Sequence, residues 1–260
     1  MTANSYKTFT LITGASGGIG AEFAKLCAAE GRNLILVARH SNSLHRLAKQ
    51  LGSDSTVHVI MQDLSEHGAA EKVYKKVRRL RANVDQLINN AGVGDFGPFA
   101  QADIGRQEQM ISLNITALAV LTRLLLPGMI KQKHGRILNV SSVSGFAPLP
   151  LMSVYAASKS FVLSFSEALS EELRDTGVSV TCLCPGPTKT NFAHSARLDP
   201  NNHIARTRVS PQAVAKYGQR AMMAGTPVAV PKIGNRLLTS VVYRLLPRFL
   251  VRRIVRHYNR

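Results

Sequence analysis

Short apolar runs alternate with helical patterns along most of this 260-residue chain. The apolar runs are FTLITGA (9–15), NLILVAR (33–39), TVHVIMQDL (56–64), DQLINNAG (85–92), GRILNVSS (135–142) and VSVTCLCPGP (178–187). Strands that are apolar along their whole length are buried on both faces, as in parallel sheets that helices cover on both sides. The alternation therefore predicts an α/β fold.

Six or so strand–helix units predict a single doubly wound, Rossmann-type domain with a mostly parallel sheet of about seven strands flanked by helices. Ligands of such a sheet bind outside the carboxyl ends of its strands. We expect a cofactor-binding half at about 1–150, a catalytic and substrate half at about 135–232, and a basic amphipathic extension at about 233–260. Residues 189–231 are richer in Pro, Asn and Gly, and we expect a loop or lid there.

The composition predicts neither disulfides nor a metal site. The N-terminus lacks the basic and apolar regions of a cleaved signal peptide, and no window approaches the ~18–20 uninterrupted apolar residues that we expect of a spanning helix. The three cysteines form no disulfide framework and no metal-binding CxxC motif. We expect Cys182 and Cys184, two residues apart in a predicted strand, to point to opposite faces. These features suit a reducing compartment, and we expect a cytoplasmic protein.

The first strand–helix junction is glycine-rich and reads TGASGGIG from Thr13 to Gly20. Its glycines Gly14, Gly18 and Gly20 permit a tight turn and a close approach of the backbone to a ligand. The helix that follows directs its N-terminal amides at an anionic phosphate. Because the motif follows a strand and precedes a helix, it predicts dinucleotide binding rather than a glycine-rich turn without a ligand.

A second feature is VYAASKSF at 154–161, in which Tyr155 and Lys159 stand four positions apart. In a helix these side chains lie on one face, one turn apart. An ammonium beside a phenol favours the ionised phenol, which makes tyrosine a usable proton donor and acceptor. The spacing alone also fits a solvated helix surface, so other motifs have to decide between the two interpretations.

These motifs together resemble the short-chain dehydrogenase/reductase family in its form of roughly 250 residues. The resemblance covers nearly the whole chain, in the family's order: TGASGGIG at 13–20, Asp63-Leu64, NNAG at 89–92, Asn114, Ser142, YAASK at 155–159 and PGPT at 185–188. Each motif is weak alone, but together, each at the expected junction, they are highly specific.

The resemblance implies a catalytic set of four residues. Tyr155 would be the general acid that protonates a carbonyl oxygen, and Lys159 would lower its pKa and hold the nicotinamide ribose. Ser142, thirteen residues before Tyr155, would hydrogen-bond the substrate oxygen. Asn114 would hold the water chain that resupplies protons past Lys159.

The resemblance also implies the residues that bind the cofactor. They are Gly14, Ser16, Gly18, Ile19, Gly20, Arg39, Asp63, Leu64, Asn90, Ala91, Gly92, Tyr155, Lys159, Pro185, Gly186 and Thr188. Residues 90–92 would line the adenosine side of the cleft, with Asp63 at the adenine amino group. Residues 185–188 would pack against and hydrogen-bond the nicotinamide carboxamide.

The end of the second predicted strand bears on the choice of cofactor. An acidic residue there accepts hydrogen bonds from a ribose 2′-OH and repels a 2′-phosphate. This chain has Ala38 at the position where NAD-using relatives carry Asp, and Arg39 follows. A guanidinium pairs well with phosphate oxygens, so the sequence predicts NADP(H) unless Arg39 is only a solvated loop charge.

The positive charge is concentrated in the last third of the chain. Residues 181–260 hold 14 of the 33 Lys and Arg but one of the 15 acidic residues. From Ile233 an apolar stripe at 237/238, 241/242, 245/246, 249/250 and 254/255 accompanies arginines at 244, 248, 252, 256 and 260, with Pro247 between. Two interpretations stay open: a helix at an anionic membrane surface, or a helix packed on the body or on a second subunit.

The sequence thus predicts an NADPH-dependent carbonyl reductase or alcohol dehydrogenase acting on a small, lipophilic ketone or aldehyde. Its apolar pocket would draw on Phe96, Phe99, Phe146, Leu149, Leu151, Met152 and Phe192. The resemblance implies a homodimer or homotetramer formed through helices around 103–130 and 153–175. Two rival classes are a non-catalytic NADP-binding sensor or scaffold and an adaptor that binds membrane or nucleic acid through the basic tail. The complete catalytic set argues against the first, and the lack of a nucleic-acid-binding signature argues against nucleic acid.

Overall fold

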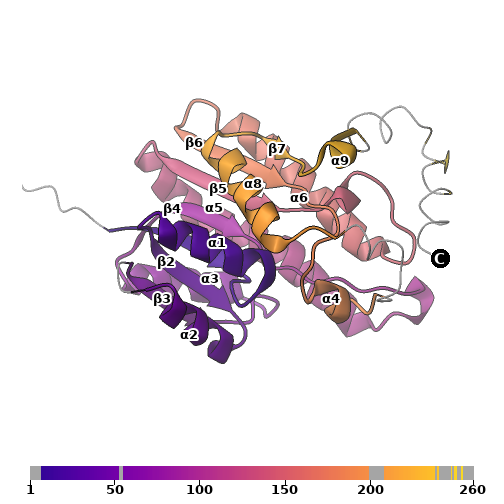
Figure 1. The fold of residues 1–260 in the computed structure, drawn as a ribbon, viewed down its shortest axis with the longest axis horizontal. Helices are drawn as coiled ribbons and strands as arrows, with labels where there is room; N and C mark the ends of the chain where they lie inside the picture. The colour runs from indigo at the N-terminus through magenta and orange to yellow at the C-terminus, as the bar shows by residue number, and fades with distance from the viewer. Residues whose placement is uncertain are drawn as a thin grey trace, which may run out of the picture.

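A seven-stranded parallel sheet forms the centre of the protein (Figure 1). The structure is a computed structural model that describes residues 7–52, 55–198 and 208–237, with single residues at 239, 247, 249, 250 and 253. The strands are β1 (Thr8–Thr13), β2 (Asn33–Ala38), β3 (Val57–Met61), β4 (Asn83–Asn89), β5 (Gly135–Val140), β6 (Val178–Leu183) and β7 (Val228–Ala229). Their order, β3-β2-β1-β4-β5-β6-β7, confirms the predicted doubly wound fold and puts the switch point between β1 and β4.

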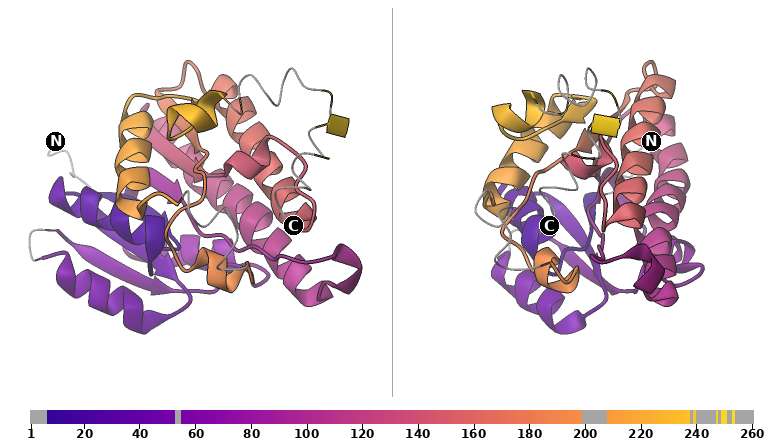
Figure 2. Two further views of the ribbon diagram at one scale, coloured as in Figure 1. Left: turned by 45° about the vertical axis from the view of Figure 1, so that its right-hand side comes forward. Right: turned by 90° about the vertical axis from the view of Figure 1, so that its right-hand side faces the viewer.

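Helices cover both faces of the sheet (Figures 1 and 2). The longer ones are α1 (Gly18–Ala29), α2 (Ser41–Gln50), α3 (Ala69–Arg79), α4 (Ile104–Ile111), α5 (Leu118–Lys131), α6 (Ser153–Glu172) and α8 (Pro211–Met223). The short ones are η1 (Phe99–Gln101), the π-helix η2 (Ser112–Ala117), η3 (Val143–Gly145), α7 (Phe192–Ser195) and α9 (Ile233–Leu237). One core packs α1, α2 and α8 on one face, and a second packs α3, α5 and α6 on the other.

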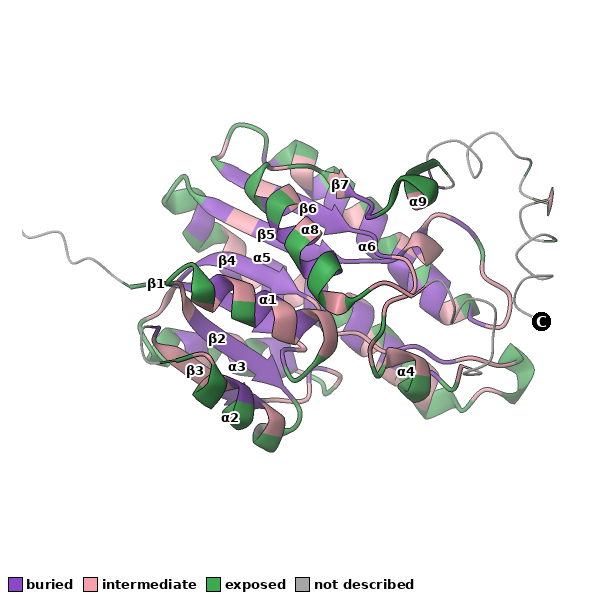
Figure 3. Ribbon diagram, viewed as in Figure 1, coloured by how far each residue is buried: buried purple, intermediate pink, exposed green. Residues whose placement is uncertain are grey.

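The continuous apolar strands are explained by these two cores. Successive side chains of a strand point to opposite faces, so each strand between two helical layers needs apolar residues at every position. In β1, Leu11 belongs to the core under α3 and α5, and Ile12 belongs to the core under α1. The strands are accordingly buried, apart from the edge strand β3, which is half-buried, while the outer helix faces are exposed (Figure 3).

Residues 211–223 form helix α8, so the expectation of a loop throughout 189–231 is wrong. Proline and glycine suggested the loop, but Pro211 stands in the first turn of α8, where it costs no hydrogen bond. Ser210 caps the helix by accepting a hydrogen bond from the Ala213 amide at 3.2 Å. Gly218 lies where a Cβ would come within 2.7 Å of Leu183 and 2.9 Å of Phe23, so the glycine permits close packing.

The expectation that Cys182 and Cys184 point to opposite faces is also wrong. Their Sγ atoms lie 3.7 Å apart, and both side chains belong to one buried cluster with Val162. In an extended chain it is residues i and i+1 that alternate, while residues i and i+2 share a face. Both cysteines are buried and free.

Two segments bear on whether the protein contacts a membrane. By length and composition alone, Ile104–Lys131 is long and apolar enough to cross a membrane, a criterion that core helices of globular proteins also meet, and 44% of its most apolar window is buried inside the protein. The predicted arginine stripe at 244, 248, 252, 256 and 260 lies outside the described residues. Of the C-terminal extension, α9 is described, and it exposes Ile233 and Leu237.

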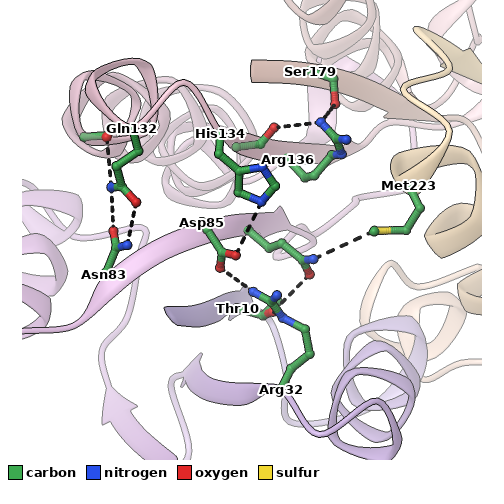
Figure 4. A network of polar contacts seen from close by, with 12 residues as sticks. Thr10, Arg32, Asn83, Asp85, Gln132, His134, Arg136, Ser179 and Met223 are labelled. Carbon is green, nitrogen blue, oxygen red and sulfur yellow. Dashed lines mark hydrogen bonds and ion pairs between the residues drawn. The ribbon is translucent and has the colours of Figure 1, made fainter. Parts of the chain in front are cut away.

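A polar network joins elements near the amino ends of the strands, whereas the predicted site lies at their carboxyl ends (Figure 4). The buried carboxylate of Asp85 on β4 pairs with Arg32 just before β2, and the Nε of Arg32 donates to Thr10 Oγ1 at 3.0 Å. His134 Nε2 lies 3.8 Å from the other oxygen of Asp85. This network ties β1, β2 and β4 together and keeps a buried charge compensated.

Candidate active site

The glycine-rich turn packs so closely on the loop after β4 that side chains are excluded. Gly14 and Gly18 have φ of 65° and 56°, a left-handed conformation that favours glycine. A Cβ on Gly14 would lie 2.8 Å from the Cα of Ala91, and one on Gly20 would lie 2.4 Å from the carbonyl oxygen of Gly14. The turn thus leads directly into the N-terminus of α1, an arrangement that fits the pyrophosphate of a dinucleotide.

Thr13 and Asn90 lock this turn to the end of β4. The Thr13 hydroxyl accepts hydrogen bonds from the amides of Asn90 at 3.0 Å and Ala91 at 3.1 Å. In return, Asn90 Nδ2 donates to the carbonyl oxygens of Thr13 and Gly14 at 3.0 and 3.1 Å. Sequence reasoning assigned Thr13 no role, although it begins the glycine motif and ends β1 as a polar residue in an apolar run.

The outer part of the predicted cofactor site lies at the ends of β2 and β3. Arg39 Nη1 stands 3.8 Å from Asp63 Oδ2, and 47% of the Arg39 side chain is exposed. Asp63 Oδ1 accepts hydrogen bonds from the amide and hydroxyl of Ser65 at 2.9 and 2.6 Å, which fixes the turn after β3. Ser16 is exposed, Ile19 is half-buried and Leu64 is buried. Arg39 and Asp63, placed separately by the motifs, are therefore neighbours.

The turn after β6 lies beside the loop after β5. The carbonyl oxygen of Pro185 accepts a hydrogen bond from the Val143 amide at 3.0 Å. A Cβ on Gly186 would lie 2.6 Å from Nδ2 of Asn235 on α9, so the C-terminal extension contacts this turn. Thr188 Oγ1 donates to the carbonyl oxygen of Gly186 at 2.9 Å, which closes the turn on itself.

Tyr155 and Lys159 lie in the first turns of α6, both buried, at the carboxyl end of β5. Lys159 Nζ lies 5.8 Å from the centroid of the Tyr155 ring and donates to the carbonyl oxygen of Val140 at 2.9 Å. Ser142 follows β5, accepts a hydrogen bond from the Ser144 amide at 3.1 Å and hydrogen-bonds Tyr155. The structure therefore brings these three predicted residues together inside the protein, which excludes the solvated-surface interpretation of VYAASKSF.

Burial dominates the protonation of both groups. Desolvation raises the pKa of the Tyr155 phenol to about 12, against a smaller lowering by the hydrogen bond with Ser142. Desolvation lowers the pKa of Lys159 to about 8. We expected Lys159 to lower the pKa of Tyr155; here burial dominates that pKa, and the ammonium donates to the Val140 carbonyl oxygen.

Asn114 lies in the π-helix η2, the irregular turn between α4 and α5. Its Oδ1 accepts a hydrogen bond from the Val93 amide at 3.0 Å, and its Nδ2 donates to the Val93 carbonyl oxygen and to Ser158 Oγ, both at 3.0 Å. A Cβ on Gly92 would lie 3.3 Å from both Asn114 Oδ1 and Lys159 Nζ. Asn114 thus joins the predicted set, beside Lys159 and Gly92.

Several serines and asparagines that sequence reasoning left without a role hold α6 against β5. Ser141 Oγ donates to the Lys159 carbonyl oxygen at 2.7 Å, and Ser160 Oγ donates to the Gly145 carbonyl oxygen at 2.7 Å. Asn139 Nδ2 donates to Ser166 Oγ at 2.9 Å. The signal for Asn139 was its place inside the apolar run ILNV, because a buried polar side chain needs a partner.

An apolar cluster surrounds Tyr155. Met110, Met152 and Tyr155 form its buried part, and Phe96, Leu149 and Phe192 pack against them. The ring of Phe192 lies 5.3 Å from that of Tyr155 between centroids. Of the other predicted pocket residues, Phe99 is 65% exposed and Phe146 packs in a separate cluster under α6. Leu151 is half-buried, with φ of 69°.

These groups can deliver a proton to an oxygen held among apolar side chains. A phenol with a raised pKa stays protonated at neutral pH and is available as a donor. Among the described residues, no group of three or more His, Cys, Asp or Glu is placed to hold a metal ion. The groups placed for proton transfer at this site are the phenol, the Ser142 hydroxyl and the Lys159 ammonium, because they lie together.

Proteins of known sequence are similar to this chain. A very-long-chain 3-oxoacyl-CoA reductase of Phaeosphaeria nodorum is 41% identical over 182 residues, which are 68% of this chain and 53% of that protein. The chain thus spans about half the length of that relative. An uncharacterized oxidoreductase of Staphylococcus aureus is 31% identical and aligns with 87% of this chain and 95% of its own.

Solved structures share the fold. A short-chain dehydrogenase from Sphingobium yanoikuyae in complex with NADPH is 32% identical and superposes with a TM-score of 0.83 over 90% of this chain and 92% of its own. A bulky-bulky ketone specific alcohol dehydrogenase from Comamonas testosteroni is 29% identical, with a TM-score of 0.76 over 93% and 95% of the two chains. The short chain dehydrogenase family model matches residues 8–201. The chain therefore belongs to the short-chain dehydrogenase/reductase family of nicotinamide-dependent oxidoreductases.

Proposed function

We propose that this protein is an NADPH-dependent reductase of lipophilic ketones or aldehydes, with Tyr155 as the general acid. The observation that carries the proposal is a buried phenol, hydrogen-bonded to Ser142 and next to Lys159, inside an apolar cluster at the carboxyl end of the sheet. Such a site suits a neutral carbonyl compound, because a charged one would have to give up its hydration there.

Each polar group then has a distinct role at the carbonyl. Bound NADPH supplies the hydride. The Tyr155 phenol donates its proton to the carbonyl oxygen, and the Ser142 hydroxyl hydrogen-bonds that oxygen and the phenol. Lys159, whose pKa of about 8 leaves it mostly charged at neutral pH, stabilises the phenolate that remains. Asn114, with its contacts to Val93 and Ser158, is the remaining member of the set.

The preference for the 2′-phosphate rests on the end of β2. The last residue of this strand is Ala38 rather than an acidic residue, and the half-exposed guanidinium of Arg39 follows it. Asp63 compensates part of that charge from 3.8 Å, which leaves other donor groups of the guanidinium for phosphate oxygens. The NADPH complex of the related Sphingobium yanoikuyae enzyme supports the same choice.

The names of the relatives support a bulky, apolar substrate. One is called a very-long-chain 3-oxoacyl-CoA reductase and another a bulky-bulky ketone specific alcohol dehydrogenase. One name describes a long acyl chain and the other a bulky ketone, and such groups would fit the aromatic and methionine side chains around Tyr155. We propose this substrate class, with 3-oxoacyl thioesters as its biological form. The single-domain organisation, the homodimer or homotetramer, the cytoplasmic location and the membrane contact of residues 233–260 remain predictions.

A screen of cofactor oxidation tests the proposal. Ketones, aldehydes, 3-oxoacyl thioesters and steroid ketones are supplied with NADPH, and loss of reduced-nicotinamide absorbance is followed. We expect turnover with apolar ketones, and Tyr155→Phe should lower kcat by about 10³-fold or more while the Kd for NADPH changes by less than about twofold. Turnover by Tyr155→Phe at a near-wild-type rate would refute the mechanism. NADPH binding without turnover of any substrate would favour the sensor or scaffold instead.

A further inference from the structure

A buried carboxylate lies at the edge of the site without any role in the reaction above. Asp95 stands in the loop after β4, and 5% of its side chain is exposed. Its oxygens accept hydrogen bonds from Arg197 Nε at 3.1 Å, from Arg197 Nη2 at 2.7 and 3.0 Å, and from Gln107 Nε2 at 2.9 Å. Arg106 Nε lies 3.3 Å from the same carboxylate. Three segments distant in sequence therefore meet at Asp95.

One of these segments covers the catalytic tyrosine. Residues 192–198 comprise α7 and the turn after it, and they begin with Phe192, whose ring packs on Tyr155. Arg106 Nη2 holds the same segment from α4 by donating to the Ser195 carbonyl oxygen at 2.9 Å. Arg197 has φ of 58°, a left-handed conformation that a non-glycine residue rarely adopts without compensating contacts.

The loop after β4 is shaped to receive this segment. A Cβ on Gly94 would lie 2.6 Å from Cζ of Phe192 and 3.3 Å from Cβ of Ala196. Phe192 and Ala196 are four residues apart, and both lie against the backbone of Gly94. Asp95 is the residue after Gly94. The backbone on which Phe192 packs and the carboxylate that binds Arg197 therefore lie side by side.

We infer that Asp95 is a positioning residue that anchors segment 192–198, and that Phe192, fixed by this anchor, determines substrate specificity beside Tyr155. Phe192 forms one wall of the space in which a carbonyl substituent lies against the phenol ring. The contacts of Asp95 fix the position of Phe192, and this position determines how wide a substituent binds well. This inference rests on the proposed reduction of apolar ketones.

The charges around Asp95 predict what happens to segment 192–198 when the carboxylate is removed. One carboxylate faces two guanidiniums, of which 54% of the Arg197 side chain and 40% of the Arg106 side chain are exposed. Replacing Asp95 by Asn keeps the shape but leaves two positive charges close together with no carboxylate between them. Their repulsion acts directly between α4 and segment 192–198, so the neutral variant should release the segment.

Hydrogen exchange tests the anchor without any substrate. Amides of residues 196, 197 and 198 donate to carbonyl oxygens within the segment, so their exchange reports its opening. In Asp95→Asn, and in the surface variant Arg197→Gln, we expect exchange of 192–198 to accelerate by about tenfold or more, with strands β1, β4 and β5 unchanged. Glu171→Gln, which breaks the exposed ion pair with Arg174, is the matched control and should change neither. Wild-type exchange in both anchor variants would refute the anchor.

Steady-state kinetics test whether Asp95 acts through Phe192. We expect Asp95→Asn to raise KM for a bulky apolar ketone by about tenfold with kcat within about twofold, and Phe192→Ala to shift the kcat/KM ratio of bulky to slender ketones by about tenfold. In the double variant, Asp95→Asn should add less than about twofold to the effect of Phe192→Ala.

The kinetic outcomes separate the inference from the proposed function. Independent, multiplying effects in the double variant would overturn the inference, because Asp95 would then act by another route. An unchanged ratio of bulky to slender ketones in Phe192→Ala would overturn the specificity role. A wild-type protein that reduces no ketone would refute the proposed function, while the exchange experiment would still decide the anchor.

Discussion

The buried ammonium of Lys159 should make the folded protein less stable than it would be with an apolar residue at this position. Lys159 is 5% exposed, and burial lowers its pKa from 10.5 to about 8. A lysine with a lower pKa in the folded state destabilises the fold while it is charged. Its cost is complete below about pH 8 and disappears as the pH rises toward the unfolded-state pKa. We therefore predict that Lys159→Met is more stable than the wild type at neutral pH.

The magnitude follows from the same pKa values. A lowering from 10.5 to about 8 corresponds to about 3 kcal/mol at neutral pH. Lys159→Met also loses the hydrogen bond to the Val140 carbonyl oxygen, which subtracts about 1 kcal/mol. The variant should thus gain about 2 kcal/mol near neutral pH. At about pH 9.5 the wild type should have regained about 2 kcal/mol, so the two proteins should become nearly equal in stability.

Urea unfolding of both proteins at about pH 7 and about pH 9.5 measures this difference. Tyr155, whose pKa is raised to about 12, begins to contribute near the upper pH but does so in both proteins. Lys75→Met, at an exposed position of α3, is the control and should show no comparable gain. The reasoning is refuted if Lys159→Met is the less stable protein at about pH 7, or if the gap stays the same at about pH 9.5.

Three further predictions address the cofactor site and the opposite edge of the sheet. Arg39→Ala should raise the Kd for NADPH by about tenfold or more and leave that for NADH within about twofold, measured by nicotinamide fluorescence; equal losses would contradict a 2′-phosphate role. Gly14→Ala places a Cβ 2.8 Å from the Cα of Ala91 at a φ of 65°, so the affinity for the cofactor, measured by calorimetry, should fall by about a hundredfold. The control Gly128→Ala, whose Cβ would meet open space, should bind the cofactor normally. Asp85→Ala leaves Arg32 unpaired and should lower the free energy of unfolding by about 3 kcal/mol in urea, with kcat unchanged at low temperature; a loss below about 1 kcal/mol would mean the pair is dispensable.

Local signals made the sheet and the glycine turn predictable from the sequence. Each of the six longer strands carried a continuous apolar run, because each lies between two helical layers. The strand ends were less clear: the run predicted at 56–64 forms a strand only to Met61. Asp63 lies beyond that end, in the turn after β3, where its carboxylate accepts hydrogen bonds from Ser65.

Long-range contacts account for what the sequence did not reveal. Asp95 and Arg197 are 102 residues apart, and neither lies in a motif with a local pattern. Thr13 and Asn90 meet from 77 residues apart, and their motifs predicted a place near the cofactor for each but not the hydrogen bond between them. The pKa of Tyr155 is raised mainly by burial, which residues from several elements provide, so the local spacing of Tyr155 and Lys159 did not reveal it.

The place of the catalytic pair is fixed by directional bonds between α6 and β5. Three consecutive residues after the middle of β5 are bound to this helix: Asn139 through Ser166, Val140 through the Lys159 ammonium, and Ser141 through the Lys159 carbonyl. Apolar packing is non-directional and would tolerate a small sliding of the helix, whereas a shift of one residue would break all three bonds. Asn89 continues the network by donating to Asn139 at 2.9 Å, which carries the register into β4 and to the cofactor turn. The buried polar groups of this half of the sheet thus hold Tyr155 and Lys159 in register with the glycine turn.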